Sequence, residues 1–529
     1  MNVEIFGGVS EIGGNKIFIT IGDKKFLFDF GLSFSESQKY FSEFLKPRKL
    51  NGIIDYLYLG LIPPINKLYR NDLIAPFSDT LNSDPYNIIT TNENIVEACF
   101  LSHAHLDHYQ FIGFLKQDTP IYMNWISQMV LEHLTTTSKD PLLDEVLNFY
   151  ESFKMVPKKR KRDDGEIEYK RAKKPDYKDS EIKRPIRILK EGKPSRFKSS
   201  RGEVDITQFQ TDHSIPGACS FIIENDGRSI IYTGDFRRHG FHSEWVNDFI
   251  EKAHDTNPIS IITEGTRVPS VEDFKTGSYR DDEQTENEVK ILASDIIKSH
   301  PGLILVRCSP RNLDRILLFY SLAKKFDRRF AITPKIFHLI DSFRMKFDTM
   351  EEERIKQYYG YYPLPDYSDK NFVVYMPRKG WGKFEAADYR EAYQSDIFRI
   401  DNYITYKDVK KEPDKYLLYL DYFMFNELID IDQKPNSTVF INSITDPFNE
   451  EMEIQEDKLN AWLEKSKISK TDTIHSSGHC SVDGLIDFLQ KVDADNIIPI
   501  HTEHPETFQE FGLSGKLILP VKGEKYTFN

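Results

Sequence analysis

Hydrophobic and polar positions alternate along the first thirty residues of the chain. The segments VEIFGG, KIFITIG and KKFLFDFG are separated by glycine and aspartate turns. This alternation predicts consecutive antiparallel strands. Asp29 lies at the end of the third segment. A shorter strand, ACFLSH, leads into a loop, and the following HYQFIGFLKQ predicts the start of a helix.

Strand patterns return in DITQFQTDHS, CSFIIEND, RSIIYTGDFR and PISIITEGTR. From about residue 280 the pattern changes to helices alternating with strands, as in ENEVKILASDIIKSH, LILVRCS, NLDRILLFYSLAKKF and RFAITP. The last part of the chain predicts a strand, a loop, a helix and a strand. An α/β arrangement with a second domain is therefore expected.

Bulk composition narrows the class of protein. A chain of 529 residues is too long for one core, and 39% hydrophobic residues exclude a disordered protein. The net charge of −13 argues against a globally basic nucleic-acid coat protein. The cysteines form no CxxC, no signal peptide is visible, and no apolar stretch approaches the ~18 residues of a membrane span. We expect reduced thiols, no membrane contact and a cytoplasmic location.

Residues 154–201 stand out by their charge, with 19 lysines and arginines against 8 acidic residues. The stretch KKRKR at 158–162 is its most basic part. We interpret the segment as a largely flexible insertion. A solvated loop and a contact with nucleic-acid phosphates are the main alternatives, and a nuclear-localisation signal is less favoured.

The segment LSHAHLDHYQ carries the clearest chemistry of the chain, with His103, His105, Asp107 and His108 in six positions. Alternation places the first two histidines on one side of an extended segment, and the turn directs the other two residues to a second point. One loop can thus serve two metal ions. Such a site needs further ligands.

Isolated candidates for those ligands follow or end predicted strands. They are His213 in TDHSIPG, Asp235 in YTGDFR and His501 in IPIHTEH. His239 and His242, just after the aspartate, are interpreted first as surface residues, with a position lining the cleft as the alternative.

The ordered motifs resemble a known superfamily. HAHLDH, together with Asp29, His213 and Asp235, matches the metallo-β-lactamase hydrolases. Glu264 in ITEGTR and His479 in SSGHCS, with the segment PIHTEH, resemble the extra motifs of the β-CASP nucleases.

Two further segments are similar to the ribonuclease J family. They are the opening GGVSEIGGNKIFITIGDKKFLFDFG and the pattern around Asn312 and Arg315 in SPRNLDRILLFY. Gly265 and Arg267 depart from the serine and asparagine usual in that family.

The resemblance implies an α/β fold, an αββα metallo-β-lactamase sandwich interrupted by an α/β β-CASP domain. The first part of the sandwich would cover residues 1–267, with the basic segment 154–201 inside it. The β-CASP domain would cover 268–468, and 469–529 would complete the sandwich. The insertions at 35–93 and 135–204 have no counterpart. The active site would lie between the domains.

The resemblance also implies roles for the site residues. His103, His105 and His213 would hold one divalent ion, Asp107, His108 and His501 the other, and Asp235 would bridge them. Zinc suits this imidazole-rich set, with manganese as an alternative. The ions would generate a hydroxide that attacks a phosphodiester.

Other residues would support catalysis without binding metal. Asp29 and Glu264 would accept hydrogen bonds from ligand imidazoles or loop groups, with a simple turn residue as the alternative for Asp29. His479 would contact the scissile phosphate or aid the leaving group. Phosphate or RNA donors are expected at Ser476, Ser477 and Gly478, and at Ser309, Asn312 and Arg315. An ordinary helix cap is the alternative for the second trio. Tyrosines of QYYGYYPLP and Trp381 are candidates for base stacking, although core packing is favoured for such aromatics.

A metal-dependent ribonuclease is the function that these features favour. It would act on single-stranded RNA from a 5′-monophosphate end, with internal cleavage as an additional mode. A DNA nuclease of the same fold is the first alternative. A small-molecule hydrolase fits poorly with Glu264, His479 and the large inserted domain. A binding protein with a dead site fits poorly with the complete ligand set. The RNA target, the balance of cleavage modes and the oligomeric state stay open.

Overall fold

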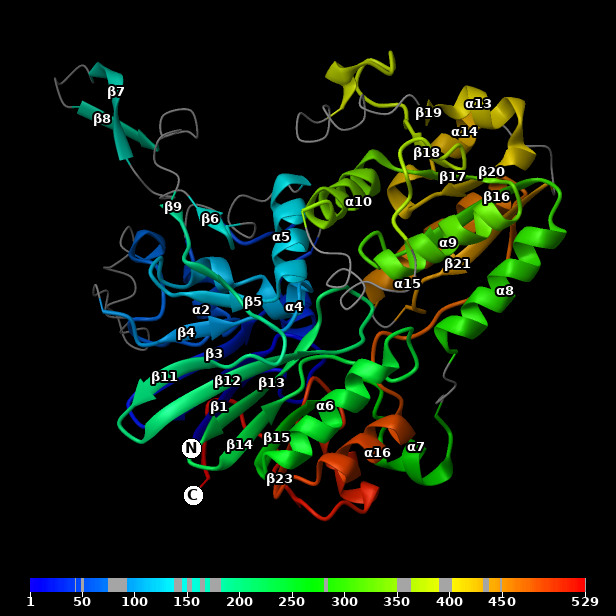
Figure 1. The fold of residues 1–529 in the computed structure, drawn as a ribbon. Helices are drawn as coiled ribbons and strands as arrows, with labels where there is room; N and C mark the ends of the chain where they lie inside the picture. Colours follow the sequence, from blue (N-terminus) through cyan, green and yellow to red (C-terminus); the bar gives the residue numbers. More distant parts are fainter. Residues whose placement is uncertain are drawn as a thin grey trace.

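The described residues form two bodies joined side by side (Figure 1). The computed structural model describes residues 1–42, 44–48, 52–74, 93–137, 145–149, 155–161, 167–171, 182–279, 284–349, 363–389, 402–431, 437–447 and 450–528. The N- and C-terminal segments lie together in the first body. Within the described residues, no helix is long and apolar enough to span a membrane.

The first sheet of the sandwich has the strand order β10-β5-β4-β3-β2-β1-β25. Its strands are β1 (Asn2–Gly7), β2 (Lys16–Ile21), β3 (Lys24–Phe30), β4 (Ala98–Phe100), β5 (Ile121–Met123), β10 (Ile186–Ile188) and β25 (Lys525–Thr527). Strands β1, β2 and β3 pair antiparallel in sequence order, which confirms the prediction from alternation. From β3 to β10 the pairing is parallel.

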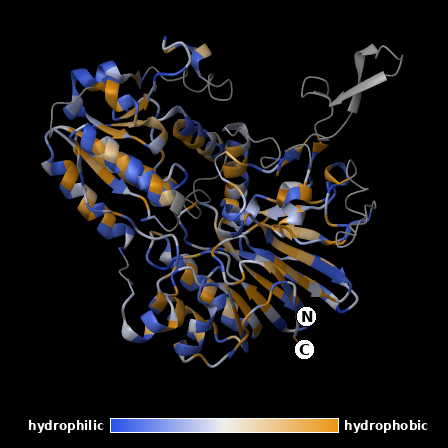
Figure 2. Cartoon of the chain, turned by 180° about the vertical axis from the view of Figure 1, so that it is seen from behind, coloured by the Kyte–Doolittle hydropathy of each residue, from blue (hydrophilic) through white to orange (hydrophobic). Residues whose placement is uncertain are grey.

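The second sheet has the order β11-β12-β13-β14-β15-β23-β24. Its strands are β11 (Ser195–Ser199), β12 (Gly202–Gln210), β13 (Cys219–Asn225), β14 (Arg228–Tyr232), β15 (Pro258–Glu264), β23 (Asn496–Ile500) and β24 (Lys516–Leu517). Aromatic side chains fill the space between the sheets, with Phe28 and Phe221 5.3 Å apart between ring centroids. Figure 2 shows hydrophobic residues gathered along these strands.

Helices cover the outer faces of both sheets. On the first sheet, α2 (Ile54–Tyr58) and α5 (Trp125–Thr137) bury Leu57, Ile126 and Val130 against the face of Leu27. On the second sheet, α6 (Ser243–Asp255) and α16 (Val482–Val492) do the same. The layers are therefore helix, sheet, sheet, helix, as expected for the predicted αββα sandwich.

A parallel sheet forms the second body, with the order β19-β18-β17-β20-β16-β21-β22. Its strands are β16 (Leu303–Cys308), β17 (Arg329–Ile332), β18 (Phe372–Tyr375), β19 (Tyr403–Ile404), β20 (Tyr416–Tyr419), β21 (Thr438–Ser443) and β22 (Ser469–Lys470). Its main helices are α8 (Glu286–Ser299), α9 (Leu313–Lys325), α10 (Pro334–Phe347) and α15 (Glu450–Lys465). This is the inserted α/β domain. Its boundaries at 268 and 468 stay a prediction.

The two bodies also meet through helices. Helix α5 of the sandwich packs against α10 of the inserted domain, where Trp125 and Phe347 lie edge to face at 6.0 Å. His133 and His338 make a second contact, with ring centroids 5.1 Å apart. The inserted domain is thus supported from the side of the first sheet as well as through its chain connections.

The insertions contain more regular structure than their charge indicates. Within the basic segment, β7 (Met155–Lys161) and β8 (Ile167–Arg171) form an antiparallel hairpin that projects from the body (Figure 1). The last residue of KKRKR, Arg162, lies outside the described residues. In the earlier insertion, Tyr56 and Tyr69 are buried in the core.

Candidate metal centre

The histidine cluster begins where β4 ends. His105 is the residue before α4 (Leu106–Tyr109), and this short helix carries Asp107 and His108. The helix predicted to start at HYQFIGFLKQ is a single turn that begins at Leu106 and ends at Tyr109. The backbone N–H of Phe111 donates to the carbonyl of Phe30 on β3, 2.9 Å away, so the chain leaves the helix to pair with the sheet.

Glycines bring two loops against Asp107. A Cβ atom on Gly31 would lie 1.6 Å from the carbonyl oxygen of Asp107. A Cβ atom on Gly13, at φ +79°, would lie 2.7 Å from Oδ2 of Asp107. The backbone N–H of Asn15 donates to the Asp107 carbonyl at 3.1 Å. The segment GGVSEIGGN therefore fixes the position of this carboxylate.

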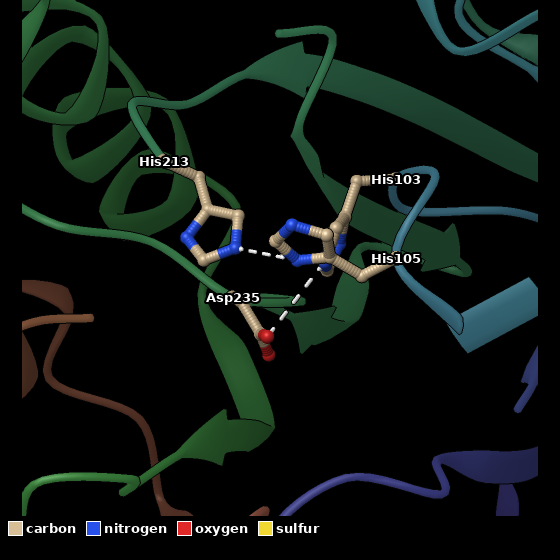
Figure 3. A group of neighbouring side chains, drawn as sticks. All are labelled: His103, His105, His213 and Asp235. Carbon is tan, nitrogen blue, oxygen red and sulfur yellow. Dashed lines mark hydrogen bonds and ion pairs between the residues drawn. The ribbon is translucent and has the colours of Figure 1, made fainter. Parts of the chain in front are cut away.

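Three groups of side chains could each hold a metal ion, and Asp235 belongs to all three. The third group, Asp235, Glu264, His479 and His501, shares two members with the second, so we describe the first two as the separate ligand groups. The first group is His103, His105, His213 and Asp235, drawn in Figure 3. Nδ1 of His105 lies 3.1 Å from Nε2 of both His103 and His213. Nε2 of His103 lies 3.7 Å from Oδ2 of Asp235.

The second group is Asp107, His108, Asp235 and His501. Nε2 of His108 lies 3.1 Å from Oδ2 of Asp235. Nε2 of His501 lies 3.2 Å from Oδ2 of Asp107 and 3.5 Å from Oδ2 of Asp235. All the residues predicted as ligands are thus brought to one point, from strand ends in both sheets.

The donor set fits two divalent ions. In each group the ligand atoms lie within 4.8 Å of one another. Burial, with neighbouring histidines, lowers the pKa of His103 and His105 well below its usual range, and that of His213 to about 4, which leaves neutral imidazoles. Oδ1 of Asp235 is buried and has no hydrogen-bond partner among the described residues. A buried carboxylate oxygen without a donor is what a bridging ligand leaves for a cation.

Asp29 supports the second group from behind. Its Oδ2 lies 2.7 Å from Nδ1 of His108, and its Oδ1 accepts from the backbone N–H of Ser102 at 2.7 Å. The hydroxyl of Tyr232 also donates to Oδ2. These contacts hold the His108 ring with Nε2 toward Asp235.

Glu264 reaches a ligand histidine only through Thr266. Its Oε2 lies 2.9 Å from Nδ1 of His479 and accepts from the hydroxyl of Thr266 at 2.6 Å. The same hydroxyl lies 2.8 Å from Nδ1 of His501. Sequence reasoning missed Thr266, because a threonine inside ITEGTR gives no signal of its own.

The small residues before His479 have a different role from the one expected. The carbonyl of Gly478 accepts from Nδ1 of His213 at 2.5 Å, and a Cβ atom on Gly478 would clash with Ser214. Oγ of Ser477 accepts from the backbone N–H of His479 at 3.1 Å. Ser476 is fully buried. The close approach allowed by these residues serves the protein's own loop, so phosphate donation by them is not supported.

The predicted donors of the second domain also need correction. Asn312 caps α9, its side chain accepting from the backbone N–H of Arg315 at 3.0 Å. Arg315 is fully buried and pairs with Glu286 through two nitrogens, at 2.8 and 3.0 Å. A guanidinium committed in this way offers nothing to RNA. Ser309 is half-buried in the same loop, where its Oγ accepts from the backbone N–H of Arg311 at 3.5 Å.

Arg311 is a further cation of the same loop. It is half-buried and precedes the capping residue. Burial and His213 lower the pKa of His105, and the charge of Arg311 contributes to this lowering. Its charge therefore acts on the first ligand group.

Two histidines near the site are buried, which contradicts their interpretation as surface residues. His239 and His242, interpreted as surface residues, are 6% and 8% exposed. His242 stacks on Trp245 at 3.9 Å and lines a pocket between the domains together with His213 and Asp314. Trp381, in contrast, is 86% exposed. Most of QYYGYYPLP lies outside the described residues.

Comparisons with known proteins agree with this geometry. A family model described as a Zn-dependent metallo-hydrolase RNA specificity domain matches residues 468–510. Ribonuclease J 2 of Streptococcus pyogenes is 22% identical over 334 residues, which cover 62% of this chain and 44% of that protein. Ribonuclease J 2 of Staphylococcus aureus is 21% identical over 329 residues, covering 61% and 43%. The chain is a β-CASP metallo-β-lactamase, similar to ribonuclease J. The matches span less than half of the length of these curated relatives.

The fold is shared with a solved structure over its whole length. The crystal structure of a protein of unknown function from Enterococcus faecalis V583 aligns with a TM-score of 0.65 and 20% identity, covering 99% of both chains. At this identity the likeness shows a shared fold.

Proposed function

We propose that this protein is a metal-dependent ribonuclease that hydrolyses phosphodiester bonds of single-stranded RNA. The observation that carries the proposal is the position of Asp235, shared by two ligand groups next to a Glu264–His479 pair. Paired metal sites of this kind serve in-line displacement at phosphorus. A single-metal hydrolase has no use for the second group.

The ligand residues would hold two zinc ions, with manganese as the alternative. When bound, such ions supply Lewis acidity and a water of lowered pKa. His103, His105 and His213 would bind the first ion, and Asp107, His108 and His501 the second. Asp235 would lie between them. The hydrogen bonds from Asp29 and Thr266 would keep the ligand rings of His108 and His501 in position.

His479 would act on the substrate directly. Burial alone would lower its pKa, but the charge and hydrogen bond of Glu264 outweigh this effect and raise the pKa to about 9. The imidazolium is partly exposed, so it can donate a hydrogen bond to the scissile phosphate or a proton to the leaving oxygen. Glu264 orients the ring through Nδ1, which leaves Nε2 for the substrate.

RNA is the favoured substrate because of the segment that carries His479. Residues 468–510 match the RNA specificity model, and the curated relatives are ribonucleases by name. The inserted domain beside the metal centre favours a polymer over a small molecule. We propose cleavage from a 5′-monophosphate end, with internal cleavage as a second mode. A DNA nuclease of the same fold stays the alternative.

The test is a time course on 3′-labelled single-stranded RNA and matched DNA, each with a 5′-monophosphate or a 5′-hydroxyl, with zinc or manganese added. Stepwise loss of the 5′-phosphorylated RNA is the expected result. Asp107→Ala is the inactive control, because this half-buried side chain can be removed without opening the core. Cleavage of DNA alone would transfer the proposal to the alternative. Retained hydrolysis by Asp107→Ala would exclude the paired-metal assignment.

A further inference from the structure

A buried series of paired charged residues, called the charge series below, connects the metal centre to the inserted domain. Its members alternate in sign and are at most 1% exposed: Asp212, Arg237, Glu286 and Arg315. None of them was expected from motif spacing to meet the others. Burying charges costs free energy unless they are paired, so this arrangement calls for a role.

In the sandwich domain, the charge series ends next to two residues predicted as metal ligands. Asp212 precedes His213, and Arg237 follows Asp235 by two positions. Nε of Arg237 donates to Oδ1 of Asp212 at 2.9 Å, and its backbone N–H donates to the carbonyl of Asp212 at 2.7 Å. The two ligand loops are therefore joined to each other through this pair.

The second-domain end is built around Glu286, the first residue of α8. Oε1 of Glu286 accepts from Nη1 of Arg237 and from Nη2 of Arg315, both at 2.8 Å. Oε2 accepts from Nε of Arg315 at 3.0 Å. One carboxylate thus lies between an arginine of each domain.

From Arg315, the charge series continues through hydrogen bonds to the segment by which the polypeptide returns to the sandwich. Nη1 of Arg315 donates to Oγ of Ser443, and this hydroxyl donates to the carbonyl of Ile474 at 2.7 Å. Nη1 of Arg237 donates to the carbonyl of Ser477 at 3.3 Å, which also contacts Nε2 of His239 at 3.1 Å. Both ends of the charge series therefore hold the loop at 474–479, which carries His479.

The charge balance depends on Glu286. Burial alone would raise its pKa, but Arg315 and Arg237 outweigh this effect and lower the pKa to about 2. The carboxylate is thus ionised at every pH at which the protein would work. Its removal would leave two buried guanidiniums facing each other, with Asp212 as the remaining hydrogen-bonded carboxylate.

We infer that Glu286 is a positioning residue, which fixes the inserted domain and the His479 loop relative to the metal centre. The inference deepens the ribonuclease function proposed above and rests on it. Glu286 touches no ligand group itself. It acts through Arg237 and Arg315, and its effect should reach the reaction as a misplaced His479.

The experiment compares Glu286→Gln with Glu288→Gln in the full chain by amide hydrogen exchange without substrate. Glu288 lies in the same helix, but it is exposed and only caps it. We expect Glu286→Gln to speed exchange at 474–480 and 286–290 tenfold or more. Strands β2 and β3 should be unchanged, and Glu288→Gln should match the wild type. Unchanged exchange at 474–480 in Glu286→Gln would overturn the inference.

A second variant guards against simple unfolding. Glu286→Met combined with Arg315→Met removes a charge of each sign and leaves Asp212 paired with Arg237. We expect this variant to fold, to bind zinc normally and to show the same fast exchange. Wild-type exchange at 474–480 in a folded double variant would also overturn the inference.

Steady-state kinetics provide a measurement that a purely structural role of Glu286 would not change. On single-stranded RNA, Glu286→Gln should lower kcat about tenfold with little change in KM, because the substrate still binds but His479 is displaced. A rise in KM alone would contradict positioning of His479. If the wild type cleaves no RNA, the proposed function fails, whereas the exchange experiment still decides the role of Glu286.

Discussion

Oδ2 of Asp29 lies 2.7 Å from Nδ1 of His108, so the third strand of the chain stands directly behind the metal centre. The opposite nitrogen of the same ring lies 3.1 Å from Oδ2 of Asp235. A residue of β3 and a residue after β14 are thus linked through one imidazole. The position of that ring therefore depends on how the two sheets pack against each other.

Asp29→Asn should weaken metal binding without unfolding the protein. The amide keeps the shape but replaces one acceptor oxygen, so the His108 ring loses its orientation and basicity. We expect a loss of about 10- to 100-fold in zinc affinity. Competition with a chelator measures it. Asp226→Asn, in the exposed β13–β14 turn, is the control and should bind zinc like the wild type.

Asp235→Asn should remove the shared ligand of both groups. We expect zinc content to fall below two ions per chain, and RNA hydrolysis to fall by roughly 1000-fold or more. Metal analysis after gel filtration, with a single-turnover assay, checks both outcomes. A variant that keeps two ions would show that Asp235 does not bridge them.

Thr266→Val should separate the hydrogen bond of the hydroxyl from its volume. The hydroxyl is half-buried and contacts Glu264, His479 and His501. Its loss leaves Nδ1 of His501 without this partner. We expect kcat to fall by about 10-fold or more, by analogy with other partners of metal ligands. Thr266→Ser keeps the hydroxyl and should recover most of the activity. Equal activity of both variants would argue against the contact.

Arg311→Met should weaken RNA binding more than it slows the chemical step. A methionine keeps the apolar stem and removes the charge that lies near His105. We expect KM for RNA to rise about tenfold and its dependence on salt to decrease, because one phosphate contact is lost. Arg228→Met is the control, since Arg228 lies at the start of β14 and pairs with Asp495. An unchanged salt dependence would remove Arg311 from the phosphate path.

Glu191→Gln should stabilise the protein at alkaline pH. Burial raises the pKa of Glu191 from 4.5 to about 7, although the backbone N–H of Gln210 partly offsets it. Between these pH values the folded state holds a proton that the unfolded chain has released. The stability of the wild type therefore falls as pH rises through about 7. A glutamine does not ionise.

The free energy of unfolding of Glu191→Gln should thus exceed that of the wild type by up to about 3 kcal/mol at pH 8, and by little at pH 4.5. Urea unfolding at a series of pH values measures the difference. Glu203→Gln, at an exposed position of β12, should follow the wild type. A difference that does not change with pH would contradict the buried, protonated state of Glu191.

Local patterns were sufficient for much of the fold. The alternation around Ile17 and Ile19 defines β2, and the periodicity of the segment at 286–299 defines α8. Short strands such as β5 carry too few residues to show a period. The β7–β8 hairpin was not expected, because its charged residues resemble those of a solvated loop.

The candidate site also contains some features that local sequence patterns predict and others that they do not. Ligand motifs are local, so their residues could be named from spacing and resemblance. Pairing between charges that are distant in the sequence leaves no local pattern. Nothing in the sequence around Arg315 indicates that its guanidinium will pair with Glu286. The capping position of Asn312 and the charge of Arg315 therefore looked like a phosphate site. Only the three-dimensional arrangement shows that Arg315 is buried and paired with Glu286.

The chain leaves the sandwich after Glu264 and comes back to β23, where Ile500 is the register neighbour of Glu264. Every residue of the two ligand groups lies outside the inserted domain. The proposed metal centre is thus encoded entirely in two stretches of the gene that flank the inserted domain. A substitution confined to the inserted domain leaves all seven ligand residues in place, and it can reach the centre only through contacts such as that of Glu286 with Arg237.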